Sequence, residues 1–290
     1  WIEPVPTSGT EPHAQLVAIR ERRTQLSRPA VARGGGGRGG RTPHTRRKKH
    51  GGATREAHAG PEQVIVANLD LQLVTLACTA TEAIRINLID RFLVAADRNG
   101  LEAVVLFNKA DLVPHRRDEY AEVVALYERL GVRAWLTSTV EGPEPGAREG
   151  IVALRAVVRN RTSVFAGPSG VGKTSLLNAL QPGLGFRTAP VNQRTGRGRH
   201  TTTAVTLLPF VFGGFLVDTP GIREFGLHDL SAADLDAFYP EIAAAAEGCE
   251  FRDCSHTGRE RGCAVQAAID DERIDWRRYD SYLALRATLE

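Results

Sequence analysis

The segment GPSGVGKT, residues 167–174, constrains the fold of this chain more than any other part of its sequence. It matches the spacing G-x-x-x-x-G-K-[ST], whose glycines let consecutive backbone N–H groups face a phosphate at the positive end of a helix. The run TSVFAG before it is typical of a strand, and KTSLLNAL is typical of the start of a helix. A glycine-rich turn is the alternative, but the strand–loop–helix context favours a phosphate-binding loop in an α/β domain.

Four residues of this loop carry the expected chemistry. Gly167 and Gly172 let the backbone curl around the phosphates. Lys173 is expected to reach the β- and γ-phosphates, and the Thr174 hydroxyl is expected to be a ligand of Mg²⁺.

A second motif, NKAD, follows the apolar run LEAVVLF. The carboxylate of Asp111 can accept hydrogen bonds from the N1–H and 2-amino groups of guanine, and Asn108 and Lys109 complete the motif. Adenine offers no such donors, so ATP would leave the carboxylate unpaired and be rejected. The alternative is a strand end followed by an ordinary helix start. The segment TST at 137–139 fits the loop that backs the base in GTPases, although this signal is weak by itself.

The order of the two motifs is unusual. In most GTP-binding domains the phosphate loop opens the domain and the guanine motif comes near its end, whereas here NKAD precedes GPSGVGKT. A rearranged chain can still form the same site, because permutation changes where the chain is cut and not which groups meet.

Two later segments are expected to sense the γ-phosphate. In DTPG, residues 218–221, Asp218 would hold a Mg²⁺-bound water and the Gly221 N–H would meet the γ-phosphate. In GRGRHTTT, residues 196–203, a threonine would reach Mg²⁺, unless the segment is a plain surface loop. The candidates are Thr201, Thr202 and Thr203, with Thr202 included in the predicted catalytic set.

The position after DTPG is Ile222, where Ras-type enzymes carry the Gln that orients the attacking water. An apolar side chain cannot orient water. We therefore expect another group to do so, either His200 or a group from a partner.

Three of the four cysteines lie within the run CEFRDCSHTGRERGC. Cys249, Cys254, His256 and Cys263 form a ligand set typical of a closed, structural zinc site. A disulfide would leave an odd thiol, and reduced structural cysteines are the remaining alternative. Cys78, on an apolar strand, is expected to be a core residue.

The charge is distributed unevenly along the chain. Residues 1–60 hold 12 Lys and Arg against 4 Asp and Glu, a net +8, whereas the rest holds 25 against 30, a net −5. A basic arm on a mildly acidic body indicates a polyanionic partner, although a solvated tail is the plainer interpretation. Residues 34–60 contain nine Gly and no large apolar residue, so we expect them to be disordered.

Nothing in the sequence indicates a membrane or a secretory leader. No apolar run approaches the ~18 residues of a membrane-spanning helix, and no signal peptide opens the chain. We therefore expect a cytoplasmic protein with no membrane partner. The sequence contains no Met, and we expect it to be a fragment or a processed form.

Strands alternating with helices predict an α/β domain with a mostly parallel sheet and ligands at the carboxyl ends of its strands. Strands are expected at residues 64–67, 71–78, 101–111 with the polar motif at its carboxyl end, 132–139 and 162–167, and in a pair joined at Gly213–Gly214. One helix is expected over INLIDRFLVAADRNG and another over EYAEVVALYERLG. The first should place Leu88, Ile89, Phe92, Leu93 and Ala96 on one face.

Helices are also expected around the cysteine cluster. Residues 231–248 should form one helix capped by Ser231, with Asp234 at its third position. Residues 275–289 should form the C-terminal helix. A basic face is possible at Arg252, Arg259, Arg261, Arg277 and Arg278, although solvated surface is the plainer interpretation.

These motifs together resemble the RsgA family of circularly permuted GTPases of small-ribosomal-subunit biogenesis. The resemblance runs from about residue 15 to the end. It rests on LSRPAVARG, ANLDLQLV, LIDRFLVAA, NKADLV, GPSGVGKTSLLNAL, GRGRHTTT, DTPGIREFGL and the C…CSH…GCAV region.

The resemblance implies three parts: an N-terminal OB barrel, a permuted GTPase domain and a zinc domain. Residues 61–227 would be the GTPase domain and 228–290 the helical zinc-binding domain. Carried over residue by residue, the family's phosphate contacts fall on Gly167, Pro168, Ser169, Gly170, Val171, Gly172, Lys173, Thr174 and Ser175, and its base contacts on Asn108, Lys109, Asp111, Thr137 and Ser138. Its implied partners are GTP or GDP with Mg²⁺, the 30S subunit and its 16S rRNA, and we expect a monomer.

The chain departs from the family pattern in three places. Residues 1–33 are too few for a five-stranded barrel, so we expect a remnant whose last strand is AQLVAIRERRTQLS. The 34–60 insertion is longer and more basic than is usual in the family. The gap between His256 and Cys263 is one residue longer, which a loop can absorb.

The leading hypothesis is a GTP-hydrolysing switch that docks on the 30S subunit and assists its late maturation. The alternatives are a GTP-binding, RNA-associated module with little hydrolysis and a permuted GTPase of the large subunit. A redox protein that uses the clustered cysteines is a remote fourth.

Overall fold

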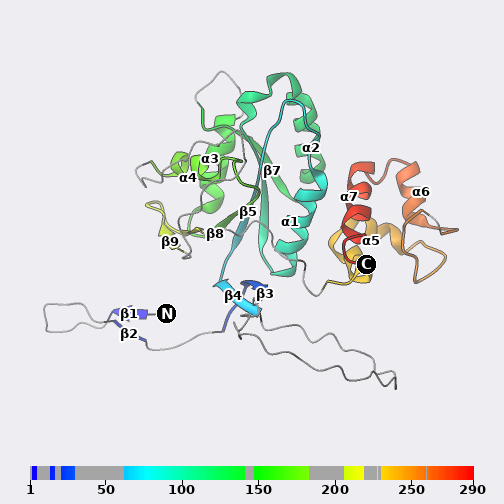
Figure 1. Ribbon diagram of the computed structural model, residues 1–290, viewed down its shortest axis with the longest axis horizontal. Helices are drawn as coiled ribbons and strands as arrows, with labels where there is room; N and C mark the ends of the chain where they lie inside the picture. The colour runs from blue at the N-terminus through cyan, green and yellow to red at the C-terminus, as the bar shows by residue number, and fades with distance from the viewer. Residues whose placement is uncertain are drawn as a thin grey trace, which may run out of the picture.

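The computed structural model describes most of the chain from residue 62 onward and short stretches before it (Figure 1). The described residues are 2–4, 14–16, 21–29, 62–140, 147–182, 206–218, 227, 230–258 and 260–290. Residues 34–60, expected to be disordered, lie outside them. Among the described residues, no helix is both long and apolar enough to cross a membrane.

A six-stranded sheet forms the centre of the molecule, with the order β7-β6-β5-β8-β10-β9. Its strands are β5 (Leu71–Ala77), β6 (Glu102–Asn108), β7 (Arg133–Thr137), β8 (Thr162–Ala166), β9 (Thr206–Pro209) and β10 (Phe215–Asp218). Neighbouring strands are parallel except for β9, which is antiparallel to β10. The mostly parallel sheet is confirmed, and the antiparallel edge follows from the short connection through Gly213 and Gly214.

Both faces of the sheet are buried because its strands are apolar on both sides. On β5, Val74 and Leu76 belong to one core, and Leu71 and Leu73 belong to the other. Helices α1 (Ile86–Arg98) and α2 (Arg117–Arg129) cover the first face, and α3 (Ala147–Val158) and α4 (Lys173–Leu180) cover the second. Two 3₁₀ turns, Ala110–Leu112 and Pro114–Arg116, connect β6 to α2.

The N-terminal strands form two separate antiparallel pairs. β1 (Ile2–Pro4) pairs with β2 (Ala14–Leu16), and β3 (Gln25–Pro29) pairs with β4 (Glu62–Ala67). The run expected as a single strand over 14–27 therefore contributes to two strands. β4, expected at 64–67, pairs with β3 and not with the central sheet.

The C-terminal part is helical and lies beside α1 and α2 (Figure 1). It contains a 3₁₀ helix, η3 (Ala232–Phe238), and helices α5 (Pro240–Ala246), α6 (Ala264–Asp270) and α7 (Trp276–Arg286). The core of this part includes Leu235, Ile242 and Val265, and Val94 of α1 projects into it. The expected C-terminal helix is confirmed as α7.

The single helix expected over residues 231–248 is wrong. It divides at Pro240, because proline lacks an N–H donor and disfavours a helical conformation in the residue before it. Tyr239 accordingly has φ −123° and ψ 82°. Ser231 precedes η3, but its hydroxyl donates to the Asp234 carboxylate at 2.6 Å and caps no backbone N–H.

Candidate functional site

The guanine motif and the phosphate loop touch each other directly, although about sixty residues separate them in the chain. The Asn108 side chain donates from Nδ2 to the carbonyl of Val171 at 2.8 Å. The Lys109 ammonium donates to the carbonyl of Gly170 at 2.7 Å. Since β5 lies between β6 and β8, the two motifs leave the same edge of the sheet one strand apart.

The side chains expected near the base also form a connected group. β6 and β7 place Asn108 opposite Thr137, and the Thr137 hydroxyl donates to Asn108 Oδ1 at 3.2 Å. The Ser138 hydroxyl donates to Asp111 Oδ1 at 2.6 Å. One oxygen of the Asp111 carboxylate is thus held by the TST segment, which fixes the direction in which this carboxylate points.

The phosphate loop connects β8 to α4 and needs glycine at its two ends. Gly167 has φ +135°, and a Cβ atom there would overlap the carbonyl of Thr75 on β5. Gly172 has φ +96°, and a Cβ atom there would overlap the amide of Asn108. The second glycine therefore lets the loop approach the guanine motif closely enough for the hydrogen bonds described above.

The cationic side chain of the loop lies over its own backbone. Lys173 donates from Nζ to the carbonyls of Gly167 and Pro168, at 2.8 and 2.7 Å. Thr174 and Ser169 are exposed, and Ser175 is half-buried at the first turn of α4. The loop thus gathers a charge, hydroxyls and a helix N-terminus, the groups that bind phosphate and its cation.

The expected γ-phosphate sensors are described only in part. β10 ends at Asp218 and pairs in parallel with β8, so the backbone of Asp218 lies at the sheet edge from which the phosphate loop leaves. His200, Thr201, Thr202, Thr203, Gly221 and Ile222 lie outside the described residues.

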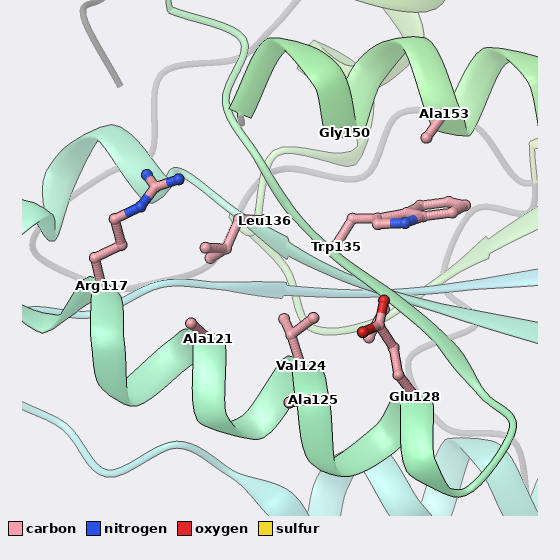
Figure 2. Close-up of a pocket in the computed structure, with 10 residues that line it drawn as sticks. Arg117, Ala121, Val124, Ala125, Glu128, Trp135, Leu136, Gly150 and Ala153 are labelled. Carbon is pink, nitrogen blue, oxygen red and sulfur yellow. The ribbon is translucent and has the colours of Figure 1, made fainter. Parts of the chain in front are cut away.

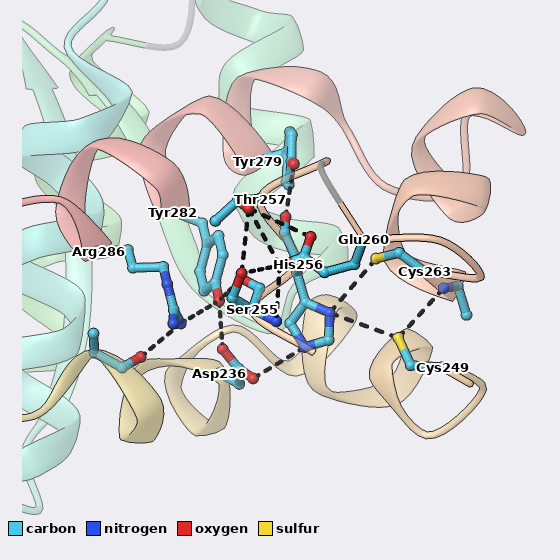
Figure 3. Close-up of polar contacts among 12 residues, drawn as sticks. Asp236, Cys249, Ser255, His256, Thr257, Glu260, Cys263, Tyr279, Tyr282 and Arg286 are labelled. Atoms are coloured by element: carbon cyan, nitrogen blue, oxygen red, sulfur yellow. Dashed lines mark hydrogen bonds and ion pairs between the residues drawn. The ribbon is translucent and has the colours of Figure 1, made fainter. Parts of the chain in front are cut away.

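The four predicted metal ligands meet in the C-terminal part. The ligand atoms of Cys249, Cys254, His256 and Cys263 all lie within 4.8 Å of one another. His256 Nδ1 is 3.6 Å from the sulfur atoms of both Cys249 and Cys263 (Figure 3). Three sulfurs and one nitrogen at such distances fit a four-coordinate metal ion, and the cluster can hold one.

Burial keeps at least one thiol of this cluster protonated when no cation is bound. Desolvation raises the pKa of the Cys254 thiol to about 12, and the sulfur atoms of Cys263 and Cys249 add to the rise. A divalent cation stabilises thiolates, the form of cysteine that binds metals. Cys78 lies apart from this group, buried in the core of the sheet, where burial raises the pKa of its thiol to about 12.

A buried ion-pair cluster joins the C-terminal part to the sheet domain. Arg278 of α7 is paired with Asp90 of α1 and, at 2.7 Å, with Glu241 of α5. The Tyr127 hydroxyl of α2 donates to Asp90 at 2.8 Å. Arg278 is 4% exposed, so its assignment to a basic surface face is wrong. A lone Asp in the apolar run NLIDRFLVAA is the sequence signal that could have identified Asp90.

The structure also contains a cavity of about 390 Å³ that includes no residue of the sequence motifs. It lies over the edge strand β7, between α2 and α3, with Trp135 beside it and Arg117 and Glu128 toward its two ends (Figure 2). Two of its lining residues, Leu136 and Gly150, lie next to Thr137 of the TST segment.

A family model described as RsgA GTPase matches residues 46–228. A relative from Gemmatimonas aurantiaca, described as small ribosomal subunit biogenesis GTPase RsgA, is 43% identical over 228 residues, or 79% of this chain and 71% of that protein. A relative with the same description from Pseudomonas fluorescens is 40% identical over 231 residues, or 79% of this chain and 65% of that protein.

Two solved structures share the fold. The crystal structure of YjeQ from Thermotoga maritima has a TM-score of 0.62 and 31% sequence identity, covering 80% of each chain. The crystal structure of YloQ, described as a circularly permuted GTPase, has a TM-score of 0.66 and 24% identity over 99% of this chain and 79% of that one. The expected permuted α/β fold is confirmed.

Proposed function

Because the chain belongs to the RsgA GTPase family, we propose that it is a GTP-hydrolysing switch that binds the small ribosomal subunit and assists its maturation. The chain matches 71% and 65% of the two relatives described above, so the activity and partners of the whole protein are part of this proposal.

The observation that carries the proposal is the pair of hydrogen bonds from Asn108 and Lys109 to the phosphate loop. These hydrogen bonds hold the guanine motif, with its base-reading carboxylate, beside the phosphate-binding loop at one sheet edge. A single nucleotide can then contact both. In this site Asp111 accepts hydrogen bonds from guanine, and Thr137 and Ser138 orient the motif from β7. The side chains of Asn108 and Lys109 hold the guanine motif next to the phosphate loop.

The phosphates are bound by the residues of the phosphate loop. These are Gly167, Pro168, Ser169, Gly170, Val171, Gly172, Lys173, Thr174 and Ser175. The Lys173 ammonium exchanges its two carbonyl partners for phosphate oxygens, and Thr174 binds Mg²⁺. Asp218 would help to hold that ion through a water molecule, and Gly221 and Thr202 would contact the γ-phosphate. His200 or a group from the partner orients the attacking water, because Ile222 cannot.

The cysteine cluster is proposed to hold one structural zinc ion through Cys249, Cys254, His256 and Cys263. All four positions are filled by protein, which leaves no open coordination site for catalysis. The zinc would stabilise the ligand loop between α5 and α6, in which His256 and Cys263 are the only buried residues among those described.

The proposed partners are GTP or GDP and the 30S subunit with its 16S rRNA, bound by a monomer in the cytoplasm. The net charge of +8 in residues 1–60 supports a polyanionic partner. The domain limits also remain proposals: a remnant of an OB barrel over 1–33, an insertion over 34–60, the GTPase domain over 61–227 and the zinc domain over 228–290.

The test is co-sedimentation of the full chain with purified 30S and 50S subunits. We expect preferential binding to 30S with a non-hydrolysable GTP analogue, weaker binding with GDP, and faster GTP turnover when 30S is added. Equal binding to both subunits would contradict the small-subunit assignment. Turnover that stays negligible with 30S present would favour the GTP-binding module with little hydrolysis.

A further inference from the structure

The two ring nitrogens of His256 face different groups. Nδ1 faces the sulfurs of Cys249 and Cys263, and Nε2 lies 3.2 Å from Oδ2 of Asp236 on η3 (Figure 3). His256 is 3% exposed, so protein shields it almost completely from solvent. Asp236 is not a member of the cysteine motif.

This geometry specifies where the ring proton lies. A neutral imidazole carries one N–H, and a carboxylate can only accept a hydrogen bond. A proton on Nε2 satisfies Asp236 and leaves the lone pair of Nδ1 directed at the sulfurs, whereas a proton on Nδ1 would face the metal position and leave Asp236 opposite another acceptor. A carboxylate that fixes a histidine in this way also makes the ring a stronger metal ligand.

We propose that Asp236 is a positioning residue of the metal site, which holds the Nε2–H tautomer of His256 so that Nδ1 binds the metal. The inference rests on the proposed metal site and is independent of GTP hydrolysis and of the ribosomal partner.

Asp236 is itself held in place by the C-terminal helix. The Tyr282 hydroxyl of α7 donates to Asp236 Oδ1 at 2.6 Å, which leaves Oδ2 for His256. Arg286 donates to the Tyr282 hydroxyl at 3.2 Å and to the carbonyl of Ala232 at 2.9 Å, so it links α7 to the start of η3.

The backbone of the metal ligand is held by the same helix face. The Tyr279 hydroxyl donates to the carbonyl of His256 at 2.7 Å. His256 has φ +57°, a left-handed conformation that costs free energy for a residue other than glycine. At His256 the carbonyl and the ring are both held by hydrogen-bond partners, and the backbone φ is unfavourable. The surrounding structure therefore keeps Nδ1 of His256 directed at the sulfur atoms.

The first test measures Zn²⁺ affinity by competition with a chromophoric chelator, using the full chain. We expect Asp236→Ala to weaken Zn²⁺ binding about 10- to 100-fold, the usual effect of losing such a carboxylate. Tyr282→Phe should weaken it less, because the carboxylate remains but loses its orientation. Asp234→Ala is the matched control, since Asp234 is an exposed carboxylate on the same 3₁₀ helix.

The second test needs no variant. Long-range ¹H–¹⁵N correlation spectra of the zinc-loaded protein report which ring nitrogen of His256 carries the proton, and we expect Nε2. Zinc on Nε2, or an Asp236→Ala affinity within twofold of the wild-type value, would overturn the inference while leaving the metal site intact. A wild-type protein that takes up no stoichiometric zinc would instead reject the metal site itself.

Discussion

At the scale of single residues, Asp111 carries the proposed base specificity. Its Oδ1 accepts from Ser138, and its carboxylate is expected to accept from guanine N1–H and the 2-amino group. Asp111→Asn replaces an acceptor by a donor, so GTP affinity should fall about 10- to 100-fold, the free energy of one or two charge-assisted hydrogen bonds. Binding of xanthosine triphosphate should rise, because xanthine has a carbonyl where guanine has its amino group.

The measurement is titration with fluorescent analogues of the two nucleotides. Asp118→Asn, at an exposed position of α2, is the control and should bind GTP like the wild type. An Asp111→Asn variant with unchanged preference for GTP would show that another group reads the base.

Gly172 allows a second test at this scale, because it lies where the two motifs touch. Gly172→Ala combines an unfavourable φ of +96° with overlap of Asn108, whereas Gly131→Ala has only an unfavourable φ of +78° and nothing within 4 Å of its Cβ. We expect Gly131→Ala to cost about 1 kcal/mol of unfolding free energy and Gly172→Ala to cost about 2–4 kcal/mol. Gly172→Ala should also weaken GTP binding, and only this variant should do so.

Urea unfolding and nucleotide titration of both variants give these values. Equal losses of stability in the two variants would mean that the approach of Asn108 to the loop is not tightly constrained.

At the scale of elements, helix α1 shows how much could be predicted from sequence. The 3.6-residue period correctly placed Ile89, Phe92 and Ala96 against the sheet. The period could not reveal that Asp90 and Val94, on another side of the helix, face the C-terminal part, because their partners come more than 130 residues later. α3 and α6 were not predicted, and the apolar pattern of residues 231–248 did not reveal that Pro240 divides this segment.

The candidate site was easier to predict than these contacts. The motif NKAD and the glycine loop have fixed internal spacings, so the residues that lie together there could be listed from the sequence, as could the four residues of the cysteine–histidine cluster. Asp236 was not predicted. The segment AADLDAF contains two acidic residues, Asp234 and Asp236, and only the three-dimensional structure shows that Asp236 lies next to His256.

The contact between α1 and α7 gives a prediction at the element scale. Burial raises the pKa of Asp90, and the neighbouring Arg278 opposes that rise. Arg278→Met would leave a 1%-exposed carboxylate unpaired, so it should cost about 3–5 kcal/mol of unfolding free energy. Arg278→Met combined with Asp90→Leu should recover only part of that loss, since the Asp90 carboxylate is gone but Glu241 still lacks its arginine partner.

Urea unfolding measures both variants. The control is Arg273→Met, which removes an exposed ion pair with Asp271 and should change stability by less than about 1 kcal/mol. A loss from Arg278→Met no larger than that of Arg273→Met would indicate that α7 is held to α1 by its apolar contacts alone.

At the scale of the whole molecule, the C-terminal part is attached to the sheet domain in two ways. One attachment is covalent, because β10 and Asp218 lead along the chain into η3. The other is the packing of α7 on α1 through Arg278 and Asp90. The C-terminal part is therefore held both by the chain that follows β10 and by its contact with α1.

The separate cores of the molecule decide what metal removal should do. The two cores of the sheet domain contain none of the four ligands, whereas Cys263 belongs to the core of the C-terminal part and Cys249 and Cys254 pack against it.

Treatment with a chelator should therefore unfold η3, α5, α6 and α7 and reduce the helical circular dichroism, while GTP affinity changes by less than about threefold. Cys249→Ser should reproduce this without chelator, and Cys78→Ala, outside the cluster, should retain zinc. If GTP binding were lost together with the helical signal, this prediction would be contradicted. The sheet domain would then depend on the C-terminal part for its own stability, through α1.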